Sequence, residues 1–224
     1  MTVTEIAILH STSGGLGDEL KKYLLAAQPI QDDWYAKTFP GSACGPPARG
    51  AAMYQQIEDP TKILLTARWE SVPQHWQWIA TDVNKEVLGD IGKHVSMDGD
   101  DKIILFHLDA DIFGAPAADG ETHLLDSPVL SVGRLFIDVD KKAAFQKEFD
   151  DVAHILKDFV APRMVRAGWR ADKEAKDKEE FVMVVGWDSV DQHMSFASSP
   201  GFAKYAGIRQ FVTGQDIKHY KRFM

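Results

Sequence analysis

The chain of 224 residues has little of several features that mark specialised classes of protein. It contains one cysteine, Cys44, so no internal disulfide can form, which is typical of a protein in a reducing compartment. It also lacks an excess of basic residues, because its formal charge is −8. A negative chain does not attract phosphate backbones or anionic lipid. We therefore expect a cytoplasmic protein that has neither nucleic acid nor a membrane as its partner.

Long hydrophobic runs are absent as well. The longest apolar stretches, IILF at 103–106 and FVMVVGW at 181–187, are far too short to span a bilayer. The opening MTVTEIAILH has no basic segment and no long apolar segment, so we expect no secretory signal. With 45% hydrophobic and 26% charged residues, the chain can nevertheless bury a real core.

Motifs for cofactors and metals are also missing. STSGGLGDE at 11–19 follows a predicted strand, but it is not the G-x-G-x-x-G pattern of dinucleotide sites. HLD at 107–109 could supply part of an iron site only within a different fold, and DGDD at 98–101 lacks the spacing of a calcium loop. The sequence therefore predicts no cofactor and no metal.

A repeated heptapeptide is the strongest signal that is present. WESVPQH at 69–75 returns as WDSVDQH at 187–193, and five of the seven letters are identical. Each copy follows a short run that is apolar at nearly every position, as in a strand covered on both faces. The S-V-x-Q that follows is a capping box, which starts a helix. The heptapeptide is thus predicted to be a strand-to-helix corner that is used twice.

The histidines of the repeat, His75 and His193, lie just inside these helices. At 100° per residue, His75 shares a helix face with Trp78 and Ile79, so it should point toward the sheet rather than toward water. Two interpretations stay open: a buried histidine that only locks the corner, or an acid/base group in a pocket.

Each half of the chain predicts the order β-α-β-β-α-β, which is ferredoxin-like. We expect an N-terminal repeat at 1–113, a Gly/Pro/Ala-rich linker at 114–128 and a C-terminal repeat at 129–224. The expected strands are 3–10, 50–58, 62–69, 102–110, 128–139, 164–171, 181–187 and 216–223, and the expected helices lie within 17–37 and start near 72, 140 and 190.

Strands that are apolar on both faces need a cover on each face. In each repeat the two helices cover one face of the sheet and leave the other uncovered. We therefore predict an α+β fold in which two ferredoxin-like repeats are fused as an intramolecular dimeric barrel, with sheet facing sheet. Since the chain supplies its own second half, the usual reason to pair is removed, and a homodimer stays open.

A strand that ends in W-[ED]-S, followed by a helix with His four residues after the Ser, resembles the dimeric α+β barrel superfamily. Within it the chain is most similar to antibiotic-biosynthesis-monooxygenase (ABM) domains. The resemblance covers both halves, and tandem versions resemble proteins of fungal secondary metabolism. It implies a pocket for a hydrophobic small molecule inside one repeat, between its sheet and its helices. The superfamily supports several chemistries, so the fold alone does not give the function.

The first half is richer in groups that transfer protons near neutral pH. The predicted catalytic residues are His10, Tyr54, His75 and His107. The predicted pocket residues are Trp34, Trp69, Trp78 and His193.

A base and a hydrogen-bond donor suit a cofactor-independent enzyme of secondary metabolism. It would cyclise, dehydrate or isomerise a polyketide, terpenoid or aromatic intermediate. The same groups suit a cofactor-free ABM-type monooxygenase that oxidises a phenol to a quinone. A third alternative is a non-catalytic stress-response or ligand-binding barrel.

Overall fold

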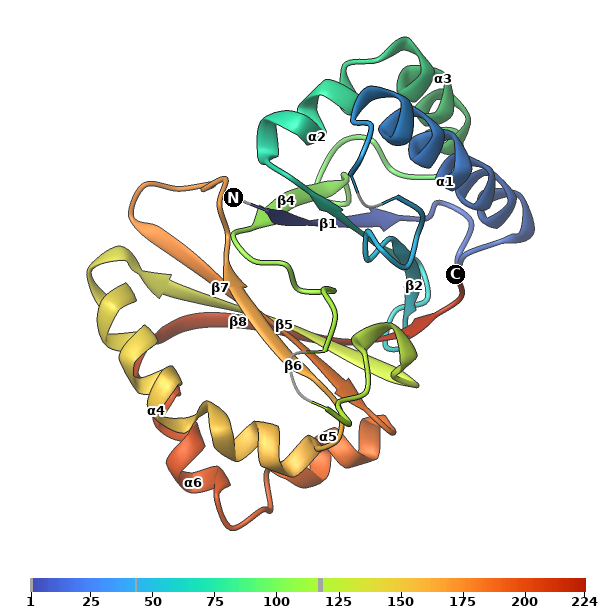
Figure 1. Cartoon of the computed structure of the whole chain (residues 1–224). Coiled ribbons are helices and arrows are strands. Elements are labelled where there is room, and N and C mark those ends of the chain that lie inside the picture. The colour runs from blue at the N-terminus through green and yellow to red at the C-terminus, as the bar shows by residue number, and fades with distance from the viewer. Residues whose placement is uncertain (1, 43, 117–118) are drawn as a thin grey trace. The chain divides into compact units, whose positions relative to one another are not determined.

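The computed structural model describes residues 2–42, 44–116 and 119–224 (Figure 1). The chain forms two compact units, which are described separately below. Unit 1 comprises Met1–Gly114 together with Lys221–Met224, and unit 2 comprises Ala115–Tyr220. The last residues of the chain thus belong to unit 1, where the Phe223 amide donates a hydrogen bond to the Met53 carbonyl at 2.9 Å. Residues 117–118 of the predicted linker lie outside the described part of the chain.

Unit 1 is an antiparallel sheet with its helices on one face (Figure 1). Its strands run in the order β4-β1-β3-β2, the ferredoxin-like order. The elements are β1 (Val3–His10), α1 (Asp18–Thr38), β2 (Ala52–Gln56), β3 (Lys62–Trp69), α2 (Val72–Ile79), α3 (Asp82–Ile91) and β4 (Ile104–Leu108).

The helix expected to run from 72 toward 87 is interrupted and forms α2 and α3. Thr81 lies between them in an extended conformation, and its hydroxyl accepts a hydrogen bond from the Asn84 amide at 3.1 Å. A threonine that caps a new helix start competes with continuation of the preceding helix, which explains the break.

Unit 2 repeats the same plan, with the strand order β8-β5-β7-β6. Its elements are η1 (Leu124–Asp126), β5 (Val129–Asp138), η2 (Val139–Lys141), α4 (Lys142–Val160), β6 (Val165–Trp169), β7 (Lys178–Trp187), α5 (Val190–Phe196), α6 (Phe202–Tyr205), η3 (Ala206–Phe211) and β8 (Val212–Arg222). The predicted fold class, α+β with two ferredoxin-like repeats, is confirmed. No helix in the described parts of the chain is long and apolar enough to cross a membrane.

The two corners are built from the same hydrogen bonds. Ser71 accepts from the Gln74 amide at 3.2 Å, and Ser189 accepts from the Gln192 amide at 3.1 Å. Each glutamine side chain reaches back and accepts from the amide just before the serine, at 2.7 Å in both copies. The predicted capping box is therefore present twice, and it sets the direction in which each helix leaves its strand.

Replacing either capping serine with alanine removes the acceptor for one amide of the first helical turn. We expect Ser71→Ala and Ser189→Ala each to lower the free energy of unfolding by about 1 kcal/mol. Urea denaturation followed by circular dichroism measures this loss. Ser198→Ala, at an exposed position after α5, serves as the control and should change stability by less than about 0.5 kcal/mol. Equal effects at all three positions would contradict a capping role.

Candidate functional site

A tryptophan–histidine stack occupies the corner of unit 1. The ring of His75, at the start of α2, lies 4.4 Å from the ring of Trp69, at the end of β3, and the two planes are only 11° apart. His75 is 1% exposed, so it points into the unit, as the helical spacing predicts. The cap at Ser71 sets this geometry because it fixes the turn between the two rings.

Two further titratable groups meet His75 inside unit 1. His75 Nδ1 lies 2.7 Å from His107 Nε2, and His75 Nε2 lies 3.4 Å from a carboxylate oxygen of Glu5. The Trp69 indole N–H donates to the same oxygen of Glu5 at 2.8 Å. Glu5 on β1 and His107 on β4 face each other directly in the strand register. Strands β1 and β4 thus place the carboxylate of Glu5 and the imidazole of His107 next to His75.

Unit 2 repeats this arrangement with one substitution. Trp187 stacks on His193 at 4.3 Å, and His193 Nδ1 lies 2.7 Å from His219 Nε2. His219 faces Ser131 in the strand register, so Ser131 occupies the place that Glu5 holds in unit 1. The Trp187 indole accordingly donates to the hydroxyl of Ser131 at 2.8 Å. The histidine pair is common to both units, and at the strand position of Glu5 unit 2 has Ser131.

Glu5, His75 and Trp78 line a cavity of about 250 Å³ in unit 1. Its walls come from the sheet and from α1, α2 and α3, which is the location that the resemblance implies. Most of the lining is aliphatic, and a few amide and hydroxyl groups interrupt it. The full lining is Glu5, Ala7, Leu9, Leu24, Ala27, Gln28, Gln31, Ala52, Met53, Leu65, Thr66, Ala67, His75, Trp78, Ile79, Asn84, Val87, Leu88, Ile91, Ile103 and Leu105.

Three other predicted residues pack against residues of this lining without being part of it. His107 is fully buried and touches the cavity only through His75. Trp69 supports the ring of His75, and Trp34 packs against Trp78 with their ring centres 5.3 Å apart.

Two of the predicted residues lie elsewhere in unit 1. His10, at the end of β1, has its Nδ1 2.6 Å from a carboxylate oxygen of Asp101 and 2.9 Å from the ammonium of Lys62. Tyr54 is buried on β2, where its ring stacks on Phe113. Neither side chain is part of the cavity lining. The remaining predicted residue, His193, lines a separate cavity in unit 2.

Sequence reasoning missed Glu5, although a signal was present. Glu5 is the single acidic residue in the strand VTEIAILH, and a lone charge on a buried strand indicates a group that needs a partner. Its partners, Trp69 and His75, come from the heptapeptide far along the chain. Only the fold brings them together.

Arg49 was also missed. It is 1% exposed, and its guanidinium carbon lies 4.1 Å from the ring of Tyr35 and 4.6 Å from that of Trp69. One nitrogen pairs with Asp32 at 3.0 Å. Burial lowers the pKa of Arg49, while the carboxylates of Asp32 and Glu5 act in the opposite direction. Arg49 therefore places a positive charge beside the ring of Trp69, which packs against His75, and near Glu5.

Metal chemistry has no evident site here. The described residues hold no group of three or more His, Cys, Asp or Glu side chains arranged to bind a metal ion.

Comparison with known proteins supports the fold. No family model and no curated protein matches the chain. Among solved structures, it is similar to an anthrone oxidase-like protein, with a TM-score of 0.66, 12% identity and coverage of 100% of this chain and 92% of the other. It is also similar to a proposed monooxygenase of Lactobacillus acidophilus NCFM, with a TM-score of 0.59, 10% identity and coverage of 99% and 93%. Chlorite dismutase of Candidatus Nitrospira defluvii gives a TM-score of 0.57 at 8% identity, with coverage of 98% and 91%. The chain thus has the tandem α+β barrel fold, and at such low identity the likeness concerns the fold alone.

The two indole hydrogen bonds offer a matched test of the charge on Glu5. Trp69→Phe and Trp187→Phe remove similar volumes, but the first removes a bond to a carboxylate and the second a bond to a hydroxyl. Because bonds to charged groups are stronger, we expect Trp69→Phe to cost about 1 kcal/mol more free energy of unfolding than Trp187→Phe. Urea denaturation of both variants gives the difference. Equal losses would show that Glu5 does not carry a charge that the indole stabilises.

Proposed function

We propose that unit 1 is a cofactor-independent enzyme that removes a proton from a hydrophobic carbon acid or phenol. Cyclisation, dehydration or isomerisation of a polyketide, terpenoid or aromatic intermediate would follow from the resulting anion. The observation that carries this proposal is the contact between Glu5 and His75 at the wall of an apolar cavity, where unit 2 has only Ser131.

The arrangement of protons among these groups fits a base that is ready to accept a proton. If His75 donates its Nδ1 proton to His107, then His75 Nε2 and the Glu5 oxygen are two acceptors that face each other at 3.4 Å. A proton taken from the substrate then lies between these two atoms and forms a charge-assisted hydrogen bond. His107 holds the tautomer, the Trp69 indole holds Glu5, and the dry surroundings strengthen the new bond.

The anion that forms on the substrate needs hydrogen-bond donors. Gln31 on α1 and Asn84 on α3 bring side-chain amides to the same cavity. The Asn84 amide donates to the Ile79 carbonyl, whereas the Gln31 amide has no hydrogen-bond partner among the described residues. Gln31 is therefore the better candidate to bind the oxygen of an enolate or phenolate.

A cofactor-free oxygenase is the second candidate, and the fold likeness to a proposed monooxygenase and to an anthrone oxidase-like protein favours it. It begins with the same proton removal. The electron-rich anion then reduces O₂, and a ring methylene becomes a carbonyl. One oxygen atom enters the product and the other leaves as water, so the four electrons lost by the methylene account for the O₂ consumed.

Proton removal can be measured with anthrone, an apolar tricyclic carbon acid, as the probe. The purified protein in deuterated buffer without oxygen should accelerate deuterium exchange at the anthrone methylene, as followed by NMR. We expect His75→Gln and Glu5→Gln to lower this acceleration by about 10²- to 10⁴-fold, since each removes one half of the base.

His154→Gln, an exposed histidine on α4, is the control and should leave the acceleration unchanged. Protein that binds anthrone without accelerating exchange would identify a ligand-binding barrel and reject the enzyme. Adding air separates the two enzymes: oxygen uptake without flavin or metal identifies the oxygenase, and exchange without oxygen uptake supports the first candidate.

A further inference from the structure

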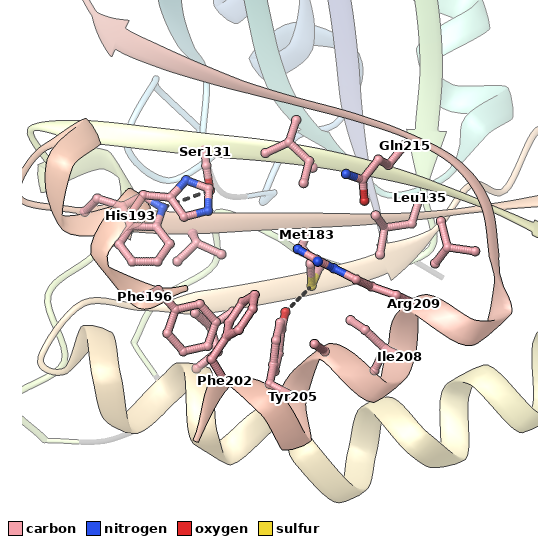
Figure 2. Close-up of a pocket in the computed structure, with 17 residues that line it drawn as sticks. Ser131, Leu135, Met183, His193, Phe196, Phe202, Tyr205, Ile208, Arg209 and Gln215 are labelled. Atoms are coloured by element: carbon pink, nitrogen blue, oxygen red, sulfur yellow. Dashed lines mark hydrogen bonds between the residues drawn. The ribbon is translucent and has the colours of Figure 1, made fainter. Parts of the chain in front are cut away.

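Unit 2 holds a cavity of its own, of about 100 Å³, between β5, β7 and β8 and the segment from α5 to η3 (Figure 2). Its walls are largely apolar, with Met183, Phe196 and Ile208 among them. A dry cavity of about 150 Å³ can hold a benzene ring. The cavity of unit 2 is smaller than this, so a single ring would fill it and extend into its opening, whereas the cavity of unit 1, at about 250 Å³, could hold a bulkier molecule.

The polar groups of this cavity are donors. Arg209 on η3 and Gln215 on β8 both project into the space (Figure 2). Arg209 is exposed and its guanidinium carbon lies 5.3 Å from the ring centre of Phe202, but it forms no ion pair within the described part of the chain. The lining contains no aspartate or glutamate. The cavity lining therefore carries one positive charge and no carboxylate.

Tyr205 adds a further donor to the lining. Its hydroxyl makes a 3.5 Å contact with the sulfur of Met183, which is only a weak acceptor (Figure 2). Burial raises the pKa of Tyr205, so the hydroxyl keeps its proton throughout the physiological range. A carboxylate oxygen would be a far better partner for this proton than the thioether.

The replacement of Glu5 by Ser131 determines which ligand charge each cavity can accept. In unit 1 the carboxylate of Glu5 repels an anionic ligand, whereas in unit 2 Ser131 takes its place and carries no charge. Ser131 faces His219 at the strand position where Glu5 faces His107 in unit 1. The cavity of unit 2 thus has an uncharged hydroxyl where the cavity of unit 1 has a carboxylate.

We propose that unit 2 carries a second binding site, for a monocyclic aromatic carboxylate. The ring lies among Met183, Phe196 and Ile208, and the carboxylate pairs with Arg209 at the opening. This site is independent of the reaction proposed for unit 1, because it uses none of the residues of the first cavity.

Isothermal titration calorimetry of the full chain with benzoate tests the proposal, and benzamide is the uncharged probe of the same shape. We expect benzoate to bind and benzamide to bind at least tenfold more weakly, because only benzoate offers Arg209 a negative charge. Arg209→Gln should weaken benzoate binding by about tenfold or more and leave benzamide binding nearly unchanged.

Lys204→Gln is the matched control, since it removes the same charge from the neighbouring α6 at an exposed position outside the cavity. It should leave the affinity for benzoate unchanged. Equal binding of benzoate and benzamide, or equal losses in the two variants, would overturn the proposal. So would the absence of benzoate binding to the wild-type chain. Because Arg209 is exposed, its variant should keep the circular dichroism spectrum and urea midpoint of the wild type.

Discussion

The stack of His75 on Trp69 is the contact on which the candidate site depends. A neutral imidazole buried without hydrogen bonds would cost several kcal/mol, so the fold must supply partners as well as a ring to pack against. The capped corner supplies the ring, and the adjacent strands supply Glu5 and His107. Each group therefore constrains another: the indole holds the carboxylate, the carboxylate faces the imidazole, and the second imidazole fixes its orientation.

Duplication of this contact explains how one chain can hold two cavities with different properties. The tryptophan, the serine cap and both histidines are present in each unit, because they hold the helix against the sheet wherever the corner occurs. This shared set positions the helix against the sheet in both units. One position differs, with Glu5 in unit 1 and Ser131 in unit 2. At this position unit 1 places a carboxylate at its cavity, whereas unit 2 places a hydroxyl. One difference on a central strand thus places a carboxylate in one cavity and a hydroxyl in the other without changing the fold.

The positive charge of Arg49 adds a further constraint to unit 1. A guanidinium that is buried beside two aromatic rings favours a negative charge nearby, and Glu5 and Asp32 provide it. Two nitrogens of Arg49, Nε and Nη2, have no hydrogen-bond partner among the described residues. A buried charge that is only partly satisfied costs stability.

The heptapeptide by itself determined the corner, the cap and the inward direction of both histidines, and the pattern of apolar residues along each half determined the ferredoxin-like order. These features depend on contacts between residues close in sequence, and local periodicity reports them. The tertiary structure decided which groups meet those histidines. Glu5 faces His107 only because β1 pairs with β4, and the loop that carries Arg49 contacts Trp69 only after the sheet has formed. For the same reason His10 and Tyr54, which the sequence grouped with His75, lie away from the cavity: strand pairing and side-chain alternation across a sheet are long-range properties that a list of titratable residues does not contain.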